Sequence, residues 1–139
     1  NRTSLVDLPK TLANGVYAVG TSSLSVSNSD VRDHDLAGVE VLADATGTLD
    51  GNTIADNARS GVYVNETADA TIIGNAIQGN GWDGVTFDGT SSGNASGNTI
   101  ENNAECGIEV TANSTATIGT NTIGAHPGGA VCDARIETP

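Results

Sequence analysis

Hydrophobic and polar positions alternate over short stretches of this chain, and the pattern repeats every 23 residues. Blocks begin at Gly15, Gly38, Gly61, Gly84 and Gly107, and most open with Gly-Val-x-Val or a close variant. Alternation is typical of β-strands, because successive side chains point to opposite faces. A constant period of this size predicts a solenoid in which each repeat forms one coil.

Four columns of the aligned repeats are aliphatic. They read Val16, Val39, Val62, Val85 and Ile108; Ala18, Val41, Val64, Phe87 and Val110; Val26, Leu49, Ile72, Ala95 and Ile118; and Val31, Ile54, Ile77, Ile100 and Ile123. β-Branched residues favour strands, and no run shows helical spacing. We therefore expect short strands joined by turns, with equivalent strands stacked in parallel.

Two further columns are polar and regular. The first reads Ser29, Asn52, Asn75, Asn98 and Asn121, and the second reads His34, Asn57, Asn80, Asn103 and His126. Asn suits turns, and stacked Asn side chains can hydrogen-bond to one another along a solenoid. We interpret both columns as structural ladders, with the two histidines at Asn positions rather than in a catalytic site.

The motif Gly-Asn-Thr-Ile-x-x-Asn-x-x-x-Gly-Val-x-Val occurs from Gly51 to Val64 and, with Ile for the first Val, from Gly97 to Val110. It resembles the right-handed parallel β-helix repeat of the pectate-lyase-like superfamily. The resemblance implies an all-β, right-handed parallel β-helix with about five full coils and partial terminal coils. We expect the helix to span residues 15–137, preceded by a partial coil or cap over 1–14 and followed by a short end over 138–139.

The two cysteines, Cys106 and Cys132, lie outside a common column if the period is strict. Three extra residues at Pro127-Gly128-Gly129 would place them in one column. Neighbouring parallel strands then bring their Cα atoms within disulfide range. We expect a disulfide that fastens the last coil, and hence an oxidising compartment.

Several features suit an extracellular or cell-surface protein. The chain contains no Met and begins at Asn1, which favours a processed mature protein or an excised domain. No transmembrane segment is expected. Glycosylation sequons begin at Asn1, Asn65, Asn94 and Asn113.

The charge balance restricts the partners. Seventeen acidic residues face five basic ones, a formal net charge of −12. Binding to nucleic acid or anionic membranes needs clustered Lys and Arg, so neither is an expected partner.

The sequence offers few residues for catalysis. Lyases and epimerases of the resembled superfamily use a basic or Tyr proton acceptor, whereas the five bases here are scattered. Asp33-His34-Asp35 is loosely similar to alginate epimerase sites, but neighbouring residues in one turn do not converge on a substrate. We expect no cofactor and no enzymatic activity; a polysaccharide lyase or epimerase is the enzymatic alternative.

Two binding surfaces remain as alternatives. The first is a polar and aromatic patch that could bind sugar. Calcium held by Asp44, Asp50, Asp56 or Asp88 is a separate option, but no spaced ligand motif supports it. The patch comprises Arg59, Tyr63, Trp82, Asp83 and Asp88. The second is an outward Thr-rich array that resembles the ice-binding face of some antifreeze solenoids. It reads Ser23 and Ser25, Thr46 and Thr48, Asp69 and Thr71, Ser92 and Asn94, and Thr115 and Thr117.

The first hypothesis for function is a non-enzymatic structural module. An open solenoid end exposes strand edges and an apolar cross-section, and no amphipathic cap is evident in the sequence. Self-association end to end would cover both ends and generate a filament or surface layer. A carbohydrate-binding or polysaccharide-processing domain of a larger surface protein is the alternative, and an ice-binding solenoid is the second alternative.

Overall fold

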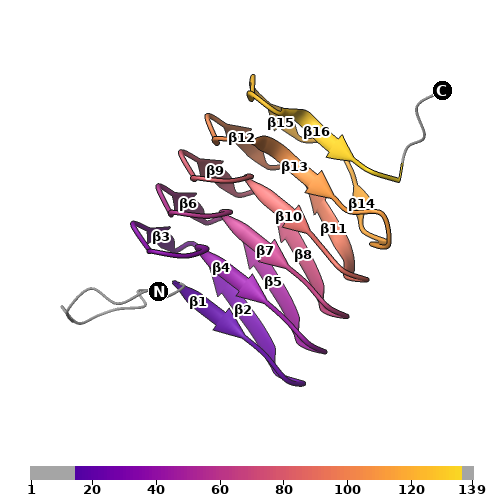
Figure 1. Cartoon of the computed structure of the whole chain (residues 1–139). Helices are drawn as coiled ribbons and strands as arrows, with labels where there is room; N and C mark the ends of the chain where they lie inside the picture. The colour runs from indigo at the N-terminus through magenta and orange to yellow at the C-terminus, as the bar shows by residue number, and fades with distance from the viewer. Residues whose placement is uncertain (1–14, 136–139) are drawn as a thin grey trace.

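The structure, a computed structural model, describes residues 15–135 as a stack of β-coils (Figure 1). All regular elements in this range are β-strands, and every strand pairing is parallel. The predicted all-β solenoid with about five coils is therefore confirmed. The partial coil expected over 1–14, and residues 136–139 at the other end, lie outside the described residues.

Three sheets run the length of the stack: each of five coils contributes one strand to each sheet, and β16 adds a sixth strand to the first sheet. The first sheet, sheet A, contains β1 (Val16–Ala18), β4 (Val39–Val41), β7 (Val62–Val64), β10 (Val85–Phe87), β13 (Cys106–Val110) and β16 (Gly129–Asp133). Sheet B contains β2 (Ser23–Ser27), β5 (Thr46–Asp50), β8 (Asp69–Ile73), β11 (Ser92–Ser96) and β14 (Thr117–Ile118). Sheet C contains β3 (Asp30–Arg32), β6 (Thr53–Ala55), β9 (Ala76–Gln78), β12 (Thr99–Glu101) and β15 (Thr122–Ile123).

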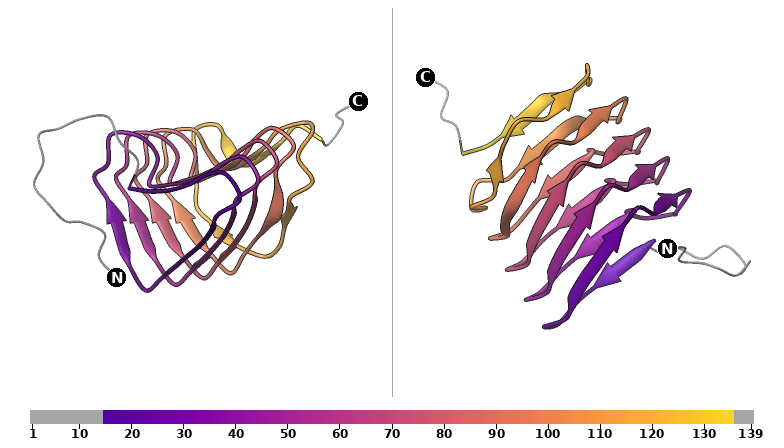
Figure 2. Two further views of the ribbon diagram at one scale, coloured as in Figure 1. Left: turned by 90° about the horizontal axis from the view of Figure 1, so that it is seen from below. Right: turned by 180° about the vertical axis from the view of Figure 1, so that it is seen from behind.

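The 23-residue period of the sequence is also the register of the strands. Val39 of β4, for example, lies opposite Val62 of β7, and Val62 lies opposite Val85 of β10. Equivalent residues are therefore stacked directly above one another, and the coils lie in file when the molecule is turned (Figure 2).

The four aliphatic columns form the core. In the inner coils their side chains have no solvent exposure, and Phe87 is the largest of them. Burying each such side chain contributes roughly 1.5–3 kcal/mol before the entropy of ordering is subtracted. The columns thus hold the three sheets together along the whole stack.

The glycine that opens each repeat is required by close approach between coils. A Cβ atom on Gly61 would lie 2.8 Å from the carbonyl oxygen of Gly84 and 2.9 Å from the amide nitrogen of Asn80. Gly38, Gly84 and Gly107 meet equivalent obstacles. Any side chain at this column would push neighbouring coils apart.

The first Asn column forms a continuous hydrogen-bonded ladder inside the turn between sheets B and C. Asn75 is 1% exposed. Its Oδ1 accepts hydrogen bonds from the backbone N–H and the side-chain amide of Asn52, at 2.8 and 3.0 Å. Its Nδ2 donates to Asn98 Oδ1 at 3.0 Å and to the carbonyl of Leu49 at 2.9 Å. Every hydrogen-bonding atom of the amide therefore has a partner, as a buried amide requires.

The second Asn column forms a similar ladder and ends on a histidine. Asn80 accepts from Asn57 and donates to Asn103, and Asn103 meets Nε2 of His126 at 3.0 Å. Nδ1 of His126 lies 2.8 Å from the carbonyl of Gly124, an acceptor only, so Nδ1 carries the proton and Nε2 accepts. The histidine completes the ladder as an Asn would.

Cys106 and Cys132 form a disulfide, but not by the predicted insertion. Cys106 lies opposite Gly129, and Cys132 lies opposite Glu109, so β13 and β16 keep the strict 23-residue register. The prediction of three extra residues at Pro127-Gly128-Gly129 is therefore wrong. The disulfide runs diagonally between neighbouring strands, with Cα atoms 6.2 Å apart. That separation lies within the ordinary disulfide range, so a shared column is not needed.

Candidate functional site

Side chains 26 residues apart meet repeatedly on the outer face of sheet A. One partner lies one residue before the opening position of a repeat, and the other is the third residue of the next repeat. The pairs are Ser60 with Thr86, Asp83 with Glu109, and Cys106 with Cys132. The Ser60 and Thr86 hydroxyls lie 2.7 Å apart, and the last pair is the disulfide. The same backbone geometry thus supports a hydroxyl pair, a carboxyl pair and a disulfide in successive coils.

Aromatic side chains lie beside these pairs. The indole of Trp82 is 40% exposed, and the guanidinium of Arg59 lies over its ring at 4.9 Å from the centroid. This cation–π contact holds the indole in place, because both residues occupy one column in successive coils. Tyr63, one of the strand-centre residues, donates its hydroxyl to Asp88 Oδ2 at 2.7 Å.

Two hollows flank Tyr63 and Trp82 along the solenoid axis. The first, of about 320 Å³, is lined by Leu36, Ala37, Glu40, Leu42, Arg59, Ser60, Tyr63, Asn65, Glu66 and Trp82. The second, of about 360 Å³, is lined by Tyr63, Trp82, Asp83, Thr86, Asp88, Glu105, Glu109 and Thr111. We call the two hollows together the sheet A trough. It crosses β4, β7, β10 and β13.

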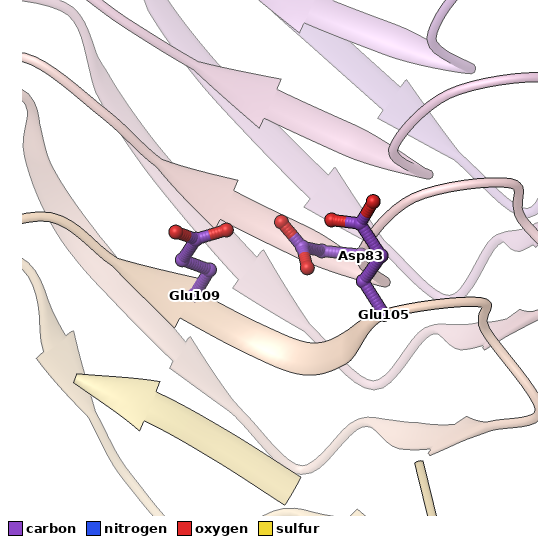
Figure 3. A group of neighbouring side chains, drawn as sticks. All are labelled: Asp83, Glu105 and Glu109. Carbon is purple, nitrogen blue, oxygen red and sulfur yellow. The ribbon is translucent and has the colours of Figure 1, made fainter. Parts of the chain in front are cut away.

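Three carboxyl groups converge in the second hollow. Asp83, Glu105 and Glu109 point toward one another (Figure 3), and their oxygens lie within 4.8 Å of one another. Asp83 is 2% exposed and accepts hydrogen bonds from the Thr86 hydroxyl at 2.8 Å and the Cys106 N–H at 2.9 Å. These two donors hold the Asp83 carboxyl group in place.

Asp83 in turn affects its neighbour Glu109. A hydrogen bond between Glu109 and Asp83, together with burial and repulsion from nearby carboxylates, raises the pKa of Glu109 to about 7. A large fraction of the Glu109 carboxyl groups is therefore protonated at neutral pH.

Asp88 has a different environment. Burial opposes its ionisation, but hydrogen bonds from Tyr63, the Gly89 N–H and Thr111 outweigh that effect and lower the pKa of Asp88. Burial and the bond to Asp88 raise the pKa of Tyr63 above its ordinary value. At neutral pH this pair is a phenol donating to a carboxylate, and it fixes the wall between the two hollows.

The three converging carboxyl groups are the ones that could hold a hard cation, because Ca²⁺ prefers oxygen ligands. They are the one group of this kind found within residues 15–135. Of the predicted calcium ligands, Asp88 lies in the trough, whereas Asp44 is hydrogen-bonded to Thr67 in an exposed turn. Asp50 and Asp56 are exposed and do not join the triad.

The structure brings the five residues of the predicted sugar patch together on this face. Trp82 and Tyr63 line both hollows, Arg59 lines the first, and Asp83 and Asp88 line the second. Sequence reasoning missed Glu105 and Glu109. Glu105 shares the column of Arg59 and Trp82, and Glu109 shares the column of Tyr63, so the repeat alignment contained the signal.

Other predicted features lie elsewhere. His34 belongs to the second Asn ladder, where its backbone N–H donates to Asn57 Oδ1 at 3.1 Å. The Thr-rich array lies on sheet B in the expected register, with Thr48 opposite Thr71. Among the sequons, Asn113 is exposed, Asn65 and Asn94 are half-buried, and Asn1 lies outside the described residues.

The parallel pairing, the constant register and the internal Asn ladders define the class of protein: a parallel β-solenoid with a trough on one sheet. A family model described as "Right handed beta helix region" matches residues 9–135, so the chain belongs to the right-handed β-helix family. The match confirms the resemblance noted from the repeat motif. This fold occurs in both enzymes and non-enzymes. No curated protein and no solved structure matches the chain significantly.

Two structural findings concern the setting of the protein. The disulfide indicates an oxidising environment, because such bonds are rare where thiols are kept reduced. Residues 15–135 contain no helix that is long and apolar enough to cross a membrane.

Proposed function

We propose that this chain is a carbohydrate-binding module whose binding surface is the sheet A trough, and that it works in an extracellular or cell-surface setting. The observation that carries the proposal is the indole of Trp82, which is held by Arg59 between two hollows lined with carboxyl and hydroxyl groups. A pyranose ring has an apolar C–H face and a rim of hydroxyls. A fixed indole suits the face, and carboxylates suit the rim.

The size of the trough also supports sugar binding. Each hollow has a volume within the range of small-molecule sites. Both are lined by a mixture of apolar and polar side chains, which allows orientation by a few hydrogen bonds. The polar groups belong to strands and tight turns of the rigid coils, so they are positioned before a ligand arrives.

The experiment compares Trp82→Ala with Tyr17→Ala on a glycan array, followed by calorimetry on the glycans that bind. Tyr17 is 53% exposed and occupies the strand-centre column of sheet A, but it lines neither hollow. We expect Trp82→Ala to weaken binding by tenfold or more and Tyr17→Ala to leave it unchanged. Absence of any glycan hit, or equal effects of the two variants, would refute the proposal.

End-to-end assembly stays a second candidate, favoured by one observation. Ile118 and Ile123 on the last described coil are half-buried, whereas the equivalent residues of the inner coils are fully buried. A neighbour stacked on β14 and β15 would cover them. Light scattering of concentrated protein across salt conditions tests this candidate, and a persistent monomer would remove it.

A further inference from the structure

The two hollows of the sheet A trough are consecutive along the solenoid axis and share a wall. Tyr63 and Trp82 line both, so a ligand that rests on the indole can extend into the first hollow, the second, or both. Neighbouring strands lie roughly 4.8 Å apart. That spacing is close to the length that one pyranose adds to an extended oligosaccharide, so β4 to β13 offer room for about three to four sugar units.

The charges along this path exclude one class of sugar. The second hollow contains four acidic side chains and no Lys or Arg: Asp83, Asp88, Glu105 and Glu109. The first contains Arg59 as its one basic side chain, and that guanidinium lies over the Trp82 ring beside Glu40 and Glu66, which line the same hollow. A uronate chain would bring one carboxylate per unit along a wall of acidic side chains, and like charges placed side by side repel.

The whole molecule adds to this effect. A formal net charge of −12 slows the approach of any polyanion at low ionic strength. A sugar without acidic groups meets no such penalty. Its hydroxyls can donate hydrogen bonds to the ionised carboxylates, and its C–H face can lie on the exposed indole.

We infer that the trough binds a linear oligosaccharide without acidic groups, lying along the solenoid axis across both hollows, and that it rejects polyuronates. This inference rests on the proposed carbohydrate-binding function, and it adds the charge class of the ligand, its minimum length and its direction. Trp82 lies at the middle of the ligand, Leu42 is at the end in the first hollow, and Thr111 is at the end in the second.

The experiment measures affinities by calorimetry at low salt for two length series. The neutral probes are di-, tetra- and hexasaccharides of β-1,4-linked glucose, xylose, mannose and N-acetylglucosamine, and the acidic probe is tetragalacturonate. For at least one neutral series we expect the affinity to rise tenfold or more from dimer to tetramer and little thereafter. Tetragalacturonate should bind at least tenfold more weakly than that tetramer.

Two further variants test position and charge. Thr111→Trp should fill the end of the second hollow and reduce the tetramer affinity toward that of the dimer, while a thermal melt checks that the coils remain folded. Glu105→Lys changes an exposed side chain, so folding should be unaffected. It should raise the affinity for tetragalacturonate at least fivefold at low salt, and Glu101→Lys on sheet C serves as the matched control.

The outcomes separate the two levels of the argument. If no saccharide binds, the proposed function itself fails. Preference for tetragalacturonate over every neutral tetramer would leave carbohydrate binding standing but overturn the inference on charge. Equal affinities for dimer and tetramer, unchanged by Thr111→Trp, would overturn the inference that the ligand spans both hollows.

Discussion

The carboxyl pair of Asp83 and Glu109 makes the stability of the folded chain depend on pH in an unusual direction. Folding raises the pKa of Glu109 from its ordinary value of 4.5 to about 7. The folded state therefore binds this proton more tightly than the unfolded state does. The resulting stabilisation is complete below about pH 4.5 and is lost as the pH rises through 7.

The magnitude follows from the size of the change. A rise from 4.5 to about 7 corresponds to at most about 3–4 kcal/mol of free energy of unfolding. Because the Glu109 side chain is partly exposed, solvent screening reduces the expected effect to roughly 1–2 kcal/mol. Glu109→Gln tests this value, since a Gln amide can donate the hydrogen bond to Asp83 without carrying a charge.

We expect Glu109→Gln to match the parent protein near pH 4 and to exceed its free energy of unfolding by about 1–2 kcal/mol at pH 8. Urea denaturation at several pH values between 4 and 8, with the disulfide intact, measures the difference. Glu101→Gln, a change at an exposed position on β12, is the control. If the free energies of unfolding of Glu109→Gln and the parent protein differ by the same amount at every pH in this range, the raised pKa of Glu109 is refuted.

Three other changes should affect stability by different mechanisms. Replacing Cys106 and Cys132 together by Ser opens a loop with a sequence separation of 26 and should lower the free energy of unfolding by about 3–4 kcal/mol, and urea titration of reduced parent protein should give the same value. Asn75→Ala leaves buried partners in the two neighbouring coils unsatisfied and should cost about 3 kcal/mol or more, whereas Asn121→Ala, at the half-buried end of the ladder, should cost less in the same titration. Gly61→Ala forces a Cβ atom against the next coil and should cost about 1–3 kcal/mol of free energy of unfolding. Gly20→Ala, at a positive φ of 73° but with open space around its Cβ position, should cost only about 1 kcal/mol. A thermal melt in which Gly20→Ala is the less stable variant would contradict the close-approach argument.

The repeat columns predicted the fold because residues paired between neighbouring strands are 23 positions apart, which is also the period of the sequence. Val62, for instance, could be assigned to a parallel ladder simply because Val39 and Val85 precede and follow it by one period. The apolar columns and the Asn ladders could be predicted without knowing the loop conformations, because each residue in them packs against equivalent residues of the neighbouring coils.

Diagonal contacts were not predictable in the same way. The assumption that bonded side chains share a column led to the incorrect insertion before Cys132 and hid the pairing of Asp83 with Glu109. In three successive coils the residue before the opening position of a repeat lies against the third residue of the next repeat, a relation between two columns. The alignment placed Glu105 and Glu109 in the columns of the trough, but their approach to Asp83 depends on this relation between two columns.

The Asn ladders have a consequence for how such a molecule can change in length. Each amide receives hydrogen bonds from the coil before it and donates to the coil after it, so every inner Asn has identical surroundings. A block of 23 residues can thus be inserted or removed in the middle of the stack without leaving an amide unmatched. Duplication of one repeat therefore lengthens the solenoid by one coil, which extends the trough or increases its distance from either end.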